Sequence, residues 1–137
     1  MRLKKIVENI TPYEVTDAAL SKDLDISYLT DNPEEKTTLK FRKPTVAQLY
    51  NLNEMVDFLK VQYPTWGSVF LQHVAIILIC FDKSCLDEDE QPSSNILLAN
   101  MISRLSPEQF SRFFIEFQEA FPSAVPTIDQ VKEVKND

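Results

Sequence analysis

One apolar stretch near the middle of the chain limits the fold more than any other feature. Between Thr65 and Phe81 the sequence has no charged side chain, and apolar residues would lie on nearly every side of a helix formed there. Such a helix is stable only where other elements cover it, in the middle of a fold or of an assembly. The run Val69–Phe81 includes Gln72 and His73 and is too short to span a bilayer. We therefore predict a buried central helix and expect no interaction with a membrane.

Start signals place further helices around this one. At three of the predicted helix starts a Ser or Thr is followed three positions later by Glu or Gln, which is the spacing of a capping box. These boxes are Thr11–Glu14, Thr45–Gln48 and Ser106–Gln109. Proline cannot continue a helix, so helices are expected to end before Pro64 and Pro122. The predicted helices cover residues 12–20, 46–63, 65–81, 95–104 and 107–121.

Two segments in the first third of the chain alternate between apolar and polar residues, as half-buried strands do. They are Leu24–Thr30 and Thr37–Arg42, and the turn residues Asp31–Glu35 separate them. A short loop between two strands favours an antiparallel hairpin, and an isolated hairpin needs helices to cover its apolar face. The predicted fold is therefore mainly α with a small antiparallel β-hairpin, an α+β class, with the helices packed around one apolar central helix.

Length and charge limit the organisation and the partners of the chain. Its 137 residues suit a single domain, residues 1–137, with a short helix and a hairpin over 1–44, a helical core over 45–121 and a frayed tail over 122–137. The net charge of −7 disfavours nucleic-acid binding, because a phosphate binder needs a basic surface. Two cysteines and an N-terminus without a signal-peptide pattern favour a reducing cytoplasm.

No residue pattern indicates catalysis, a cofactor or a metal. His73 is the only histidine, and a position within an apolar run is typical of a core or interface histidine. Cys80 and Cys85 lack the paired clusters of zinc sites, so we predict that they and His73 bind no zinc. No serine lies in a nucleophile elbow, and no two carboxylates are marked as a general acid and base. We expect a non-enzymatic protein without a cofactor.

An acidic run, Asp87–Glu90, lies in the polar stretch that follows the central helix. It fails the pattern of a calcium-binding loop, since no glycine stands at the sixth position counted from Asp82. A solvated run of charges is the common interpretation of such a segment. A docking site for a basic partner is the alternative.

Phenylalanines recur along one face of the last predicted helix, at i, i+3, i+4, i+7 and i+11. Core packing is the first interpretation of this stripe. Five such rings are nevertheless a large area for a small domain to enclose, so some of them would then cover a partner or a second copy of the chain. The candidate partner-binding residues are Phe110, Phe113, Phe114 and Phe117 of the stripe, together with Trp66 and Phe70.

The stretches "LKFRKPTVAQLYNL" and "ISRLSPEQFSRFFIEFQEAF", with the apolar helix between them, resemble small tail assembly chaperones of long-tailed bacteriophages. In that family a strand ends in a basic-Pro-Thr junction that leads into a Leu-rich helix, and a later turn with Ser and Glu opens a helix near the C-terminus. Here these places are Leu39–Leu52 and Leu105–Phe121. The resemblance implies an acidic, mostly helical protein without catalytic residues in the cytoplasm of the bacterial host. Its implied partners are the tape measure protein, a long apolar helical protein, and the tail tube subunits brought to it.

Functions other than that of a chaperone are also compatible with the sequence. An acidic inhibitor or DNA mimic would carry acids in rows spaced like phosphates, whereas here they scatter apart from Asp87–Glu90. A structural subunit of a phage particle would stay in the finished virion, which a chaperone does not. A small enzyme has almost no support in the sequence. The sequence therefore favours a protein that binds other proteins, with a second copy of itself among the partners to consider.

Overall fold

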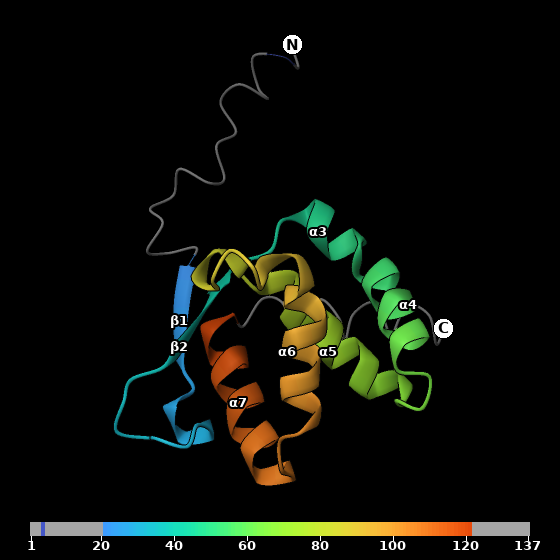
Figure 1. Cartoon of the computed structure of the whole chain (residues 1–137). Coiled ribbons are helices and arrows are strands. Elements are labelled where there is room, and N and C mark those ends of the chain that lie inside the picture. The colour runs from blue at the N-terminus through green and yellow to red at the C-terminus, as the bar shows by residue number, and fades with distance from the viewer. Residues whose placement is uncertain (1–3, 5–20, 122–137) are drawn as a thin grey trace.

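The structure is a computed structural model that describes Lys4 and the residues from Ser21 to Phe121. Within that part a two-stranded sheet and a set of helices confirm the predicted mainly-α member of the α+β class (Figure 1). The elements are β1 (Ser21–Asp25), η1 (Ser27–Leu29), β2 (Thr38–Arg42), α3 (Val46–Tyr50), α4 (Leu52–Gln62), α5 (Ser68–Cys80), η2 (Lys83–Cys85), η3 (Gln91–Ser93), α6 (Ser94–Ser103) and α7 (Pro107–Ala120). The predicted helix over 12–20 and the tail over 122–137 lie outside the described residues.

The hairpin has the predicted antiparallel pairing, with Leu24 opposite Leu39, but its first strand is displaced toward the N-terminus. The predicted strand over 24–30 is wrong beyond Asp25, because the chain turns there into η1. The carboxylate of Asp25 accepts a hydrogen bond from the backbone amide of Ser27 at 2.8 Å. Local side-chain bonds of this kind compete with the hydrogen bonds of a strand. Ile26 is nevertheless buried, as the alternation predicts.

The single helix predicted over 46–63 is two helices, α3 and α4, which meet at Asn51. Asn51 ends α3 with its amide bonded to the carbonyls of Gln48 and Leu49, and it is also the N-cap residue of α4. At the start of α3 the predicted capping box is confirmed. The Thr45 hydroxyl accepts from the Gln48 amide at 3.1 Å, and the Thr45 amide donates to the Gln48 side chain at 2.9 Å.

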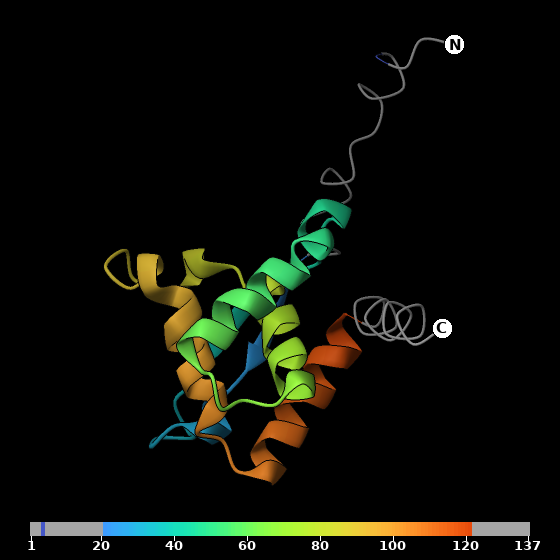
Figure 2. The same cartoon turned by 90° about the vertical axis from the view of Figure 1, so that its right-hand side faces the viewer.

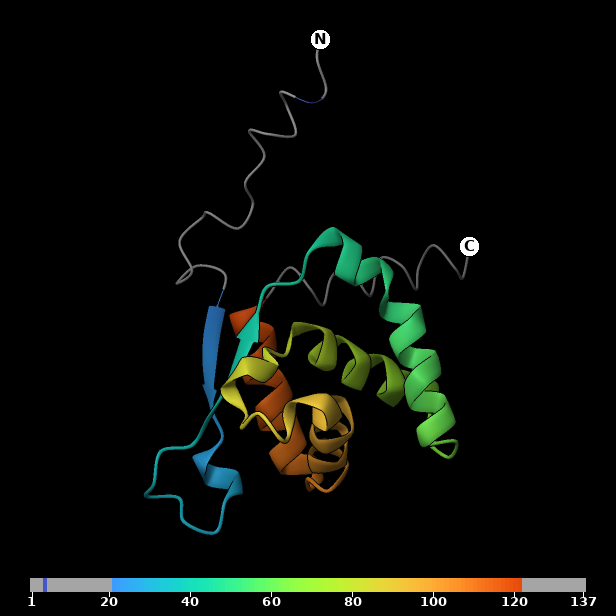
Figure 3. The same ribbon diagram turned by 45° about the horizontal axis from the view of Figure 1, so that its top comes forward.

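Helix α5 lies in the middle of the described fold, as its apolar sequence predicts (Figure 3). It begins at Ser68 and not at Thr65, and its buried side chains are Leu71, Val74, Ala75, Ile76, Ile77, Leu78 and Cys80. Helices α4 and α6 both pack on it, and α4 crosses in front of it in the view of Figure 2. No helix among residues 21–121 is both long enough and apolar enough to cross a membrane.

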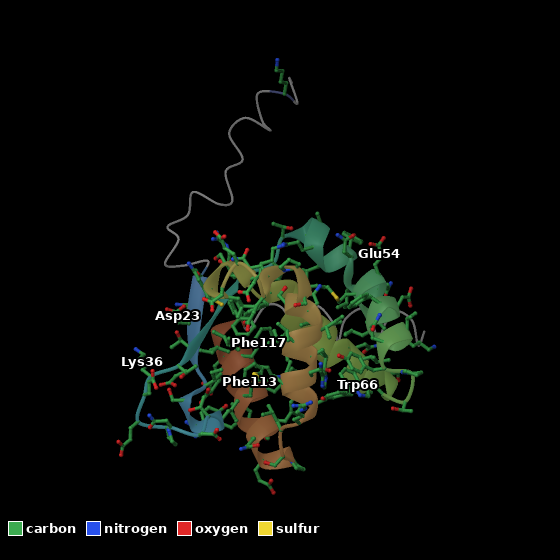
Figure 4. All side chains as sticks on the ribbon, viewed as in Figure 1. Asp23, Lys36, Glu54, Trp66, Phe113 and Phe117 are labelled. Carbon is green, nitrogen blue, oxygen red and sulfur yellow. The ribbon has the colours of Figure 1, made fainter. Side chains whose placement is uncertain are left out.

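A cluster of four phenylalanines joins the sheet to the helices. The Phe41 ring of β2 is fully buried and contacts the rings of Phe81, Phe113 and Phe117, with centroids 5.5, 6.3 and 5.7 Å away. Phe81 follows α5 and forms a backbone bridge with Phe41, whereas Phe113 and Phe117 come from α7. Figure 4 shows the two α7 rings in the interior, between the hairpin and α6. The cluster therefore fixes where α5 ends and how α7 lies on the hairpin.

The capping box of α7 offers a test of this arrangement. The Ser106 hydroxyl accepts from the Gln109 amide at 3.2 Å, and α7 contributes two rings to the core. We expect Ser106→Ala to lower the free energy of unfolding by about 1 kcal/mol in urea denaturation. The control Ser111→Ala, at an exposed position of the same helix, should change it by less than ~0.5 kcal/mol. Equal values for the two variants would contradict a stabilising cap.

Candidate functional site

The structure places two of the predicted partner-binding residues in the core. Phe113 and Phe117 expose none of their surface, so in this structure they cannot contact a partner. Their rings lie against Phe41 and belong to the cluster that joins the hairpin to α7. For these two positions the structure agrees with core packing as the interpretation of the phenylalanine stripe.

The other four predicted residues are half-buried, and their aromatic rings form a continuous row of contacts along α5 and α7. Trp66 stacks on Tyr63 with centroids 3.9 Å apart, and it contacts Phe70 edge-on at 4.8 Å. Phe70 reaches Phe110 at 5.8 Å, and Phe110 stacks on Phe114 at 5.6 Å. The rings thus cover one another and pack against the core. The structure brings these four residues together, but as packing between α5 and α7.

The residues considered for metal binding do not converge. His73 stacks on the ring of Phe114 at 4.6 Å, Cys80 is buried and Cys85 is exposed. Burial raises the pKa of the Cys80 thiol to about 12. Among the described residues, no three His, Cys, Asp or Glu side chains lie close enough together to hold a metal ion.

A groove with a volume of about 440 Å³ lies between α4 and α6, over the end of α5. Its lining residues are Gln48, Asn51, Glu54, Met55, Phe58, Leu78, Ile79 and Asn95. Met55 and Phe58 of α4 and Leu78 and Ile79 of α5 supply the apolar floor, and the amide and carboxylate groups lie around it. Helices α4 and α6 both pack on α5, and residues of all three helices line the groove.

A hydrogen bond links the end of α4 to α6. The Tyr63 hydroxyl, just after α4, donates to Oδ1 of Asn100 in α6 at 2.6 Å. Earlier in the same two helices, Phe58 and Asn95 both line the groove. The bond therefore fixes α4 relative to α6 at the end of α4 that lies away from Asn51.

Apolar side chains continue from the groove onto the outer surface of α3 and α4. Val46 is 69% exposed, Tyr50 is 83% exposed, Phe58 is 37% exposed and Val61 is 78% exposed. Val46 and Tyr50 are four residues apart in α3, and Phe58 and Val61 are three apart in α4, so each pair shares one side of its helix. Glu54 is exposed on α4 (Figure 4). Isolated exposed apolar residues are ordinary on a folded protein, so the relevant feature of these four is their position on the two helices that border the groove.

The mouth of the groove is basic, although the protein is acidic. A neighbouring hollow of about 240 Å³ shares Gln48 and Ile79 with the groove and is lined by Arg42, Lys43 and Lys83. Asp82 lies in the same hollow. Burial opposes the ionisation of Asp82, but hydrogen bonds from Ser84 and the charges of Lys40 and Arg42 lower its pKa below the usual value. The hollow therefore combines one carboxylate with three cationic side chains next to an apolar floor.

Sequence reasoning missed this groove for an identifiable reason. The apolar spacing over residues 46–63 predicted one continuous helix. The structure has a break at Asn51, so α3 and α4 run in different directions. A signal was nevertheless present. Leu52, Met55, Val56 and Leu59 pack against the core, whereas Phe58 and Val61 are exposed, so α4 has more apolar residues than its packed face uses.

Comparisons of the chain with protein-family models, with curated proteins and with solved structures gave no match. The function must therefore be inferred from the site itself.

The hydrogen bond between the end of α4 and α6 can be tested by Tyr63→Phe. This change leaves Oδ1 of Asn100 without its donor, so we expect the free energy of unfolding to fall by about 1 kcal/mol. Tyr50→Phe is the matched control, because that hydroxyl is on an exposed side chain. If both variants unfold at the wild-type urea concentration, the bond does not hold α4 and α6 together.

The different surroundings of the two thiols predict a difference in reactivity. The thiolate is the reactive form, so the raised pKa and the burial of Cys80 should protect it, whereas Cys85 is exposed. We expect a thiol reagent at pH 8 to modify one cysteine per folded chain rapidly and the second only after denaturation. Cys85→Ser should abolish the rapid phase, and two equally fast thiols in the native protein would contradict the structure.

Proposed function

We propose that this protein is a non-enzymatic protein-binding factor that holds a helical segment of a partner in the groove between α4 and α6. The observation that carries the proposal is the apolar floor of Met55, Phe58, Leu78 and Ile79, which continues into the exposed row of Val46 and its neighbours. A small-molecule site would enclose most of its ligand, whereas this groove is open to solvent along α4.

The chemistry of the groove specifies the kind of helix it accepts. An amphipathic helix binds such grooves through apolar residues at i, i+3 or i+4 and i+7, which here would lie over Phe58 and Ile79. The basic hollow at the mouth, with Arg42, Lys43 and Lys83, suits an acidic side chain or the C-terminal end of the partner helix. Apolar contact supplies the affinity, and the charges at the mouth set the orientation.

Within this class, a phage tail assembly chaperone is the function we favour. The resemblance of Leu39–Leu52 and Leu105–Phe121 to that family supports it, and Leu39–Leu52 includes the junction that leads into the groove. The partner would be the tape measure protein, a long apolar helical protein, to which the chaperone would recruit tail tube subunits in the cytoplasm of the bacterial host. A protein that holds such a helix needs an apolar surface and no catalytic group.

The positions of the charged residues argue against the DNA mimic, one of the alternative functions. A DNA mimic needs rows of carboxylates, but the acids of β1, α4 and α7 are scattered, and the groove opens beside cationic side chains. The structural phage subunit differs from the chaperone in one observable respect, because only the subunit would be found in purified particles.

The proposal predicts which partner is recovered and which substitution releases it. The tagged full-length chain, expressed in its native host during infection, should co-purify with a long helical protein encoded by a neighbouring reading frame. Recovery should persist at 1 M salt, where the Debye length of about 3 Å screens exposed charges but not apolar packing. Recovery of a nuclease or polymerase that high salt removes would contradict the proposal.

A matched pair of variants ties the binding to the groove. Phe58→Glu places a charge on its floor and should reduce recovery of the partner at least about tenfold, because burial of one large apolar side chain is worth more than that factor. Ile115→Glu makes the same kind of change at an exposed position of α7 and should bind like the wild type. Equal recovery with both variants would place the binding surface elsewhere.

A further inference from the structure

A second apolar pocket lies on the other side of α6, away from the groove. It has a volume of about 140 Å³ and lies between β2, the end of α5, the loop that follows α5, and α6. Its lining residues are Leu39, Phe81, Leu86, Glu90, Ser94, Leu97, Leu98 and Met101. Almost all of this lining is apolar, and Leu97 at the rim is 43% exposed.

The loop that forms one wall is held in place by its own hydrogen bonds. The Leu86 amide donates to the Lys83 carbonyl at 3.0 Å, and the Leu86 carbonyl accepts from the Gln91 side chain at 3.1 Å. The Asp82 carboxylate accepts from the hydroxyl of Ser84 at 2.6 Å and from its amide at 3.0 Å. Leu86 is therefore fixed against α6 by the loop itself, so the wall of the pocket needs no occupant to form.

The same loop places carboxylates at the rim of the pocket. Glu90 lines the pocket directly, and Asp87, Glu88 and Asp89 precede it on exposed positions. In the described part of the chain, the structure shows no ion pair for any of these four side chains. Consecutive carboxylates repel one another, and a cation brought to this rim would relieve that repulsion. A solvated charge run needs no apolar pocket beside it, whereas a docking site does.

We infer that this pocket binds one aliphatic side chain of a partner segment in which lysine or arginine flanks that side chain. A closed apolar cavity of about 150 Å³ in another protein accommodates benzene, so a volume of 140 Å³ suits one leucine, isoleucine or methionine side chain. The acidic rim selects basic neighbours. The site is distinct from the groove, whose mouth carries cationic side chains, so the two surfaces fit segments of opposite charge.

The probe is a set of three synthetic peptides added to the full-length protein with ¹³C-labelled methyl groups. The first has one leucine flanked by two lysines on each side, the second replaces leucine by serine, and the third replaces the lysines by glutamates. We expect the first peptide to shift the methyl signals of Leu97, Leu98 and Met101 in a saturable way. The other two should bind at least about tenfold more weakly, since each lacks one of the two contacts.

Two double variants of the full-length protein separate this pocket from general attraction to an acidic protein. Glu88→Lys with Asp89→Lys should weaken binding of the lysine–leucine peptide severalfold or more. Glu34→Lys with Glu35→Lys changes net charge equally in the exposed β1–β2 loop and should leave the signals at Leu97 and Met101 responsive. Equal weakening by both pairs would overturn the inference, as would equal binding of the leucine and serine peptides or the absence of any methyl shift at millimolar peptide.

A third double variant tests whether the chain fills the pocket itself. The sequence "RLKKIV" at residues 2–7 has the same basic and aliphatic composition as the inferred segment. If Lys4→Glu with Lys5→Glu shifts the Leu97 and Met101 methyl signals without any peptide, the chain's own segment is the occupant and the partner inference is wrong. Unchanged signals, with peptide binding retained, support a partner.

Discussion

The packing of Phe41 against Phe81, Phe113 and Phe117 is the interaction on which the rest of the described fold depends. The Phe41 ring comes from a two-stranded sheet that would be marginal alone, and its neighbours come from the end of α5 and from α7. Because Phe41 and Phe81 also form a backbone bridge, the direction of α5 is set by the sheet. Once α5 is fixed, α4 and α6 pack on it, and the space between them becomes the groove.

Few side chains of α3 and α4 are buried, so the surface of these two helices beside the groove faces the solvent. Helix α3 has no buried residue, and within α4 Leu59 alone is buried. The Tyr63–Asn100 bond joins the end of α4 to α6, and the chain changes direction at Asn51, between α3 and α4 (Figure 1). Tyr50 and Phe58 are exposed on α3 and α4, and they belong to the surface that the proposed partner would cover.

The sequence predicted well the features that depend on local chemistry. The capping boxes at Thr45 and Ser106 formed as their spacing indicates, and the uncharged run ending at Phe81 became the buried central helix. Prediction failed where a local effect opposed the pattern. The Asp25 side chain ended the first strand early, and Asn51 divided a helix whose apolar spacing continues across it.

The candidate site was less predictable than the fold because exposure is a property of tertiary packing. From spacing alone Phe113 and Phe114 are equivalent members of one stripe, yet Phe113 is fully buried and Phe114 is only half-buried. Phe58 could be recognised as surplus to the buried face of α4, but the groove beside it also needs Ile79 and Asn95, which come from other helices. Only their arrangement in space shows that these residues meet.

Site-specific photo-crosslinking in the native host tests the central claim, that the groove between α4 and α6 is the partner-binding surface, most directly. A benzophenone amino acid would replace Glu54 at the groove in one strain and Glu119, on the exposed side of α7, in another. The account predicts a crosslink from position 54 to one amphipathic helical segment of a partner and none from position 119. A partner crosslinked from position 119 but not from position 54 would contradict it.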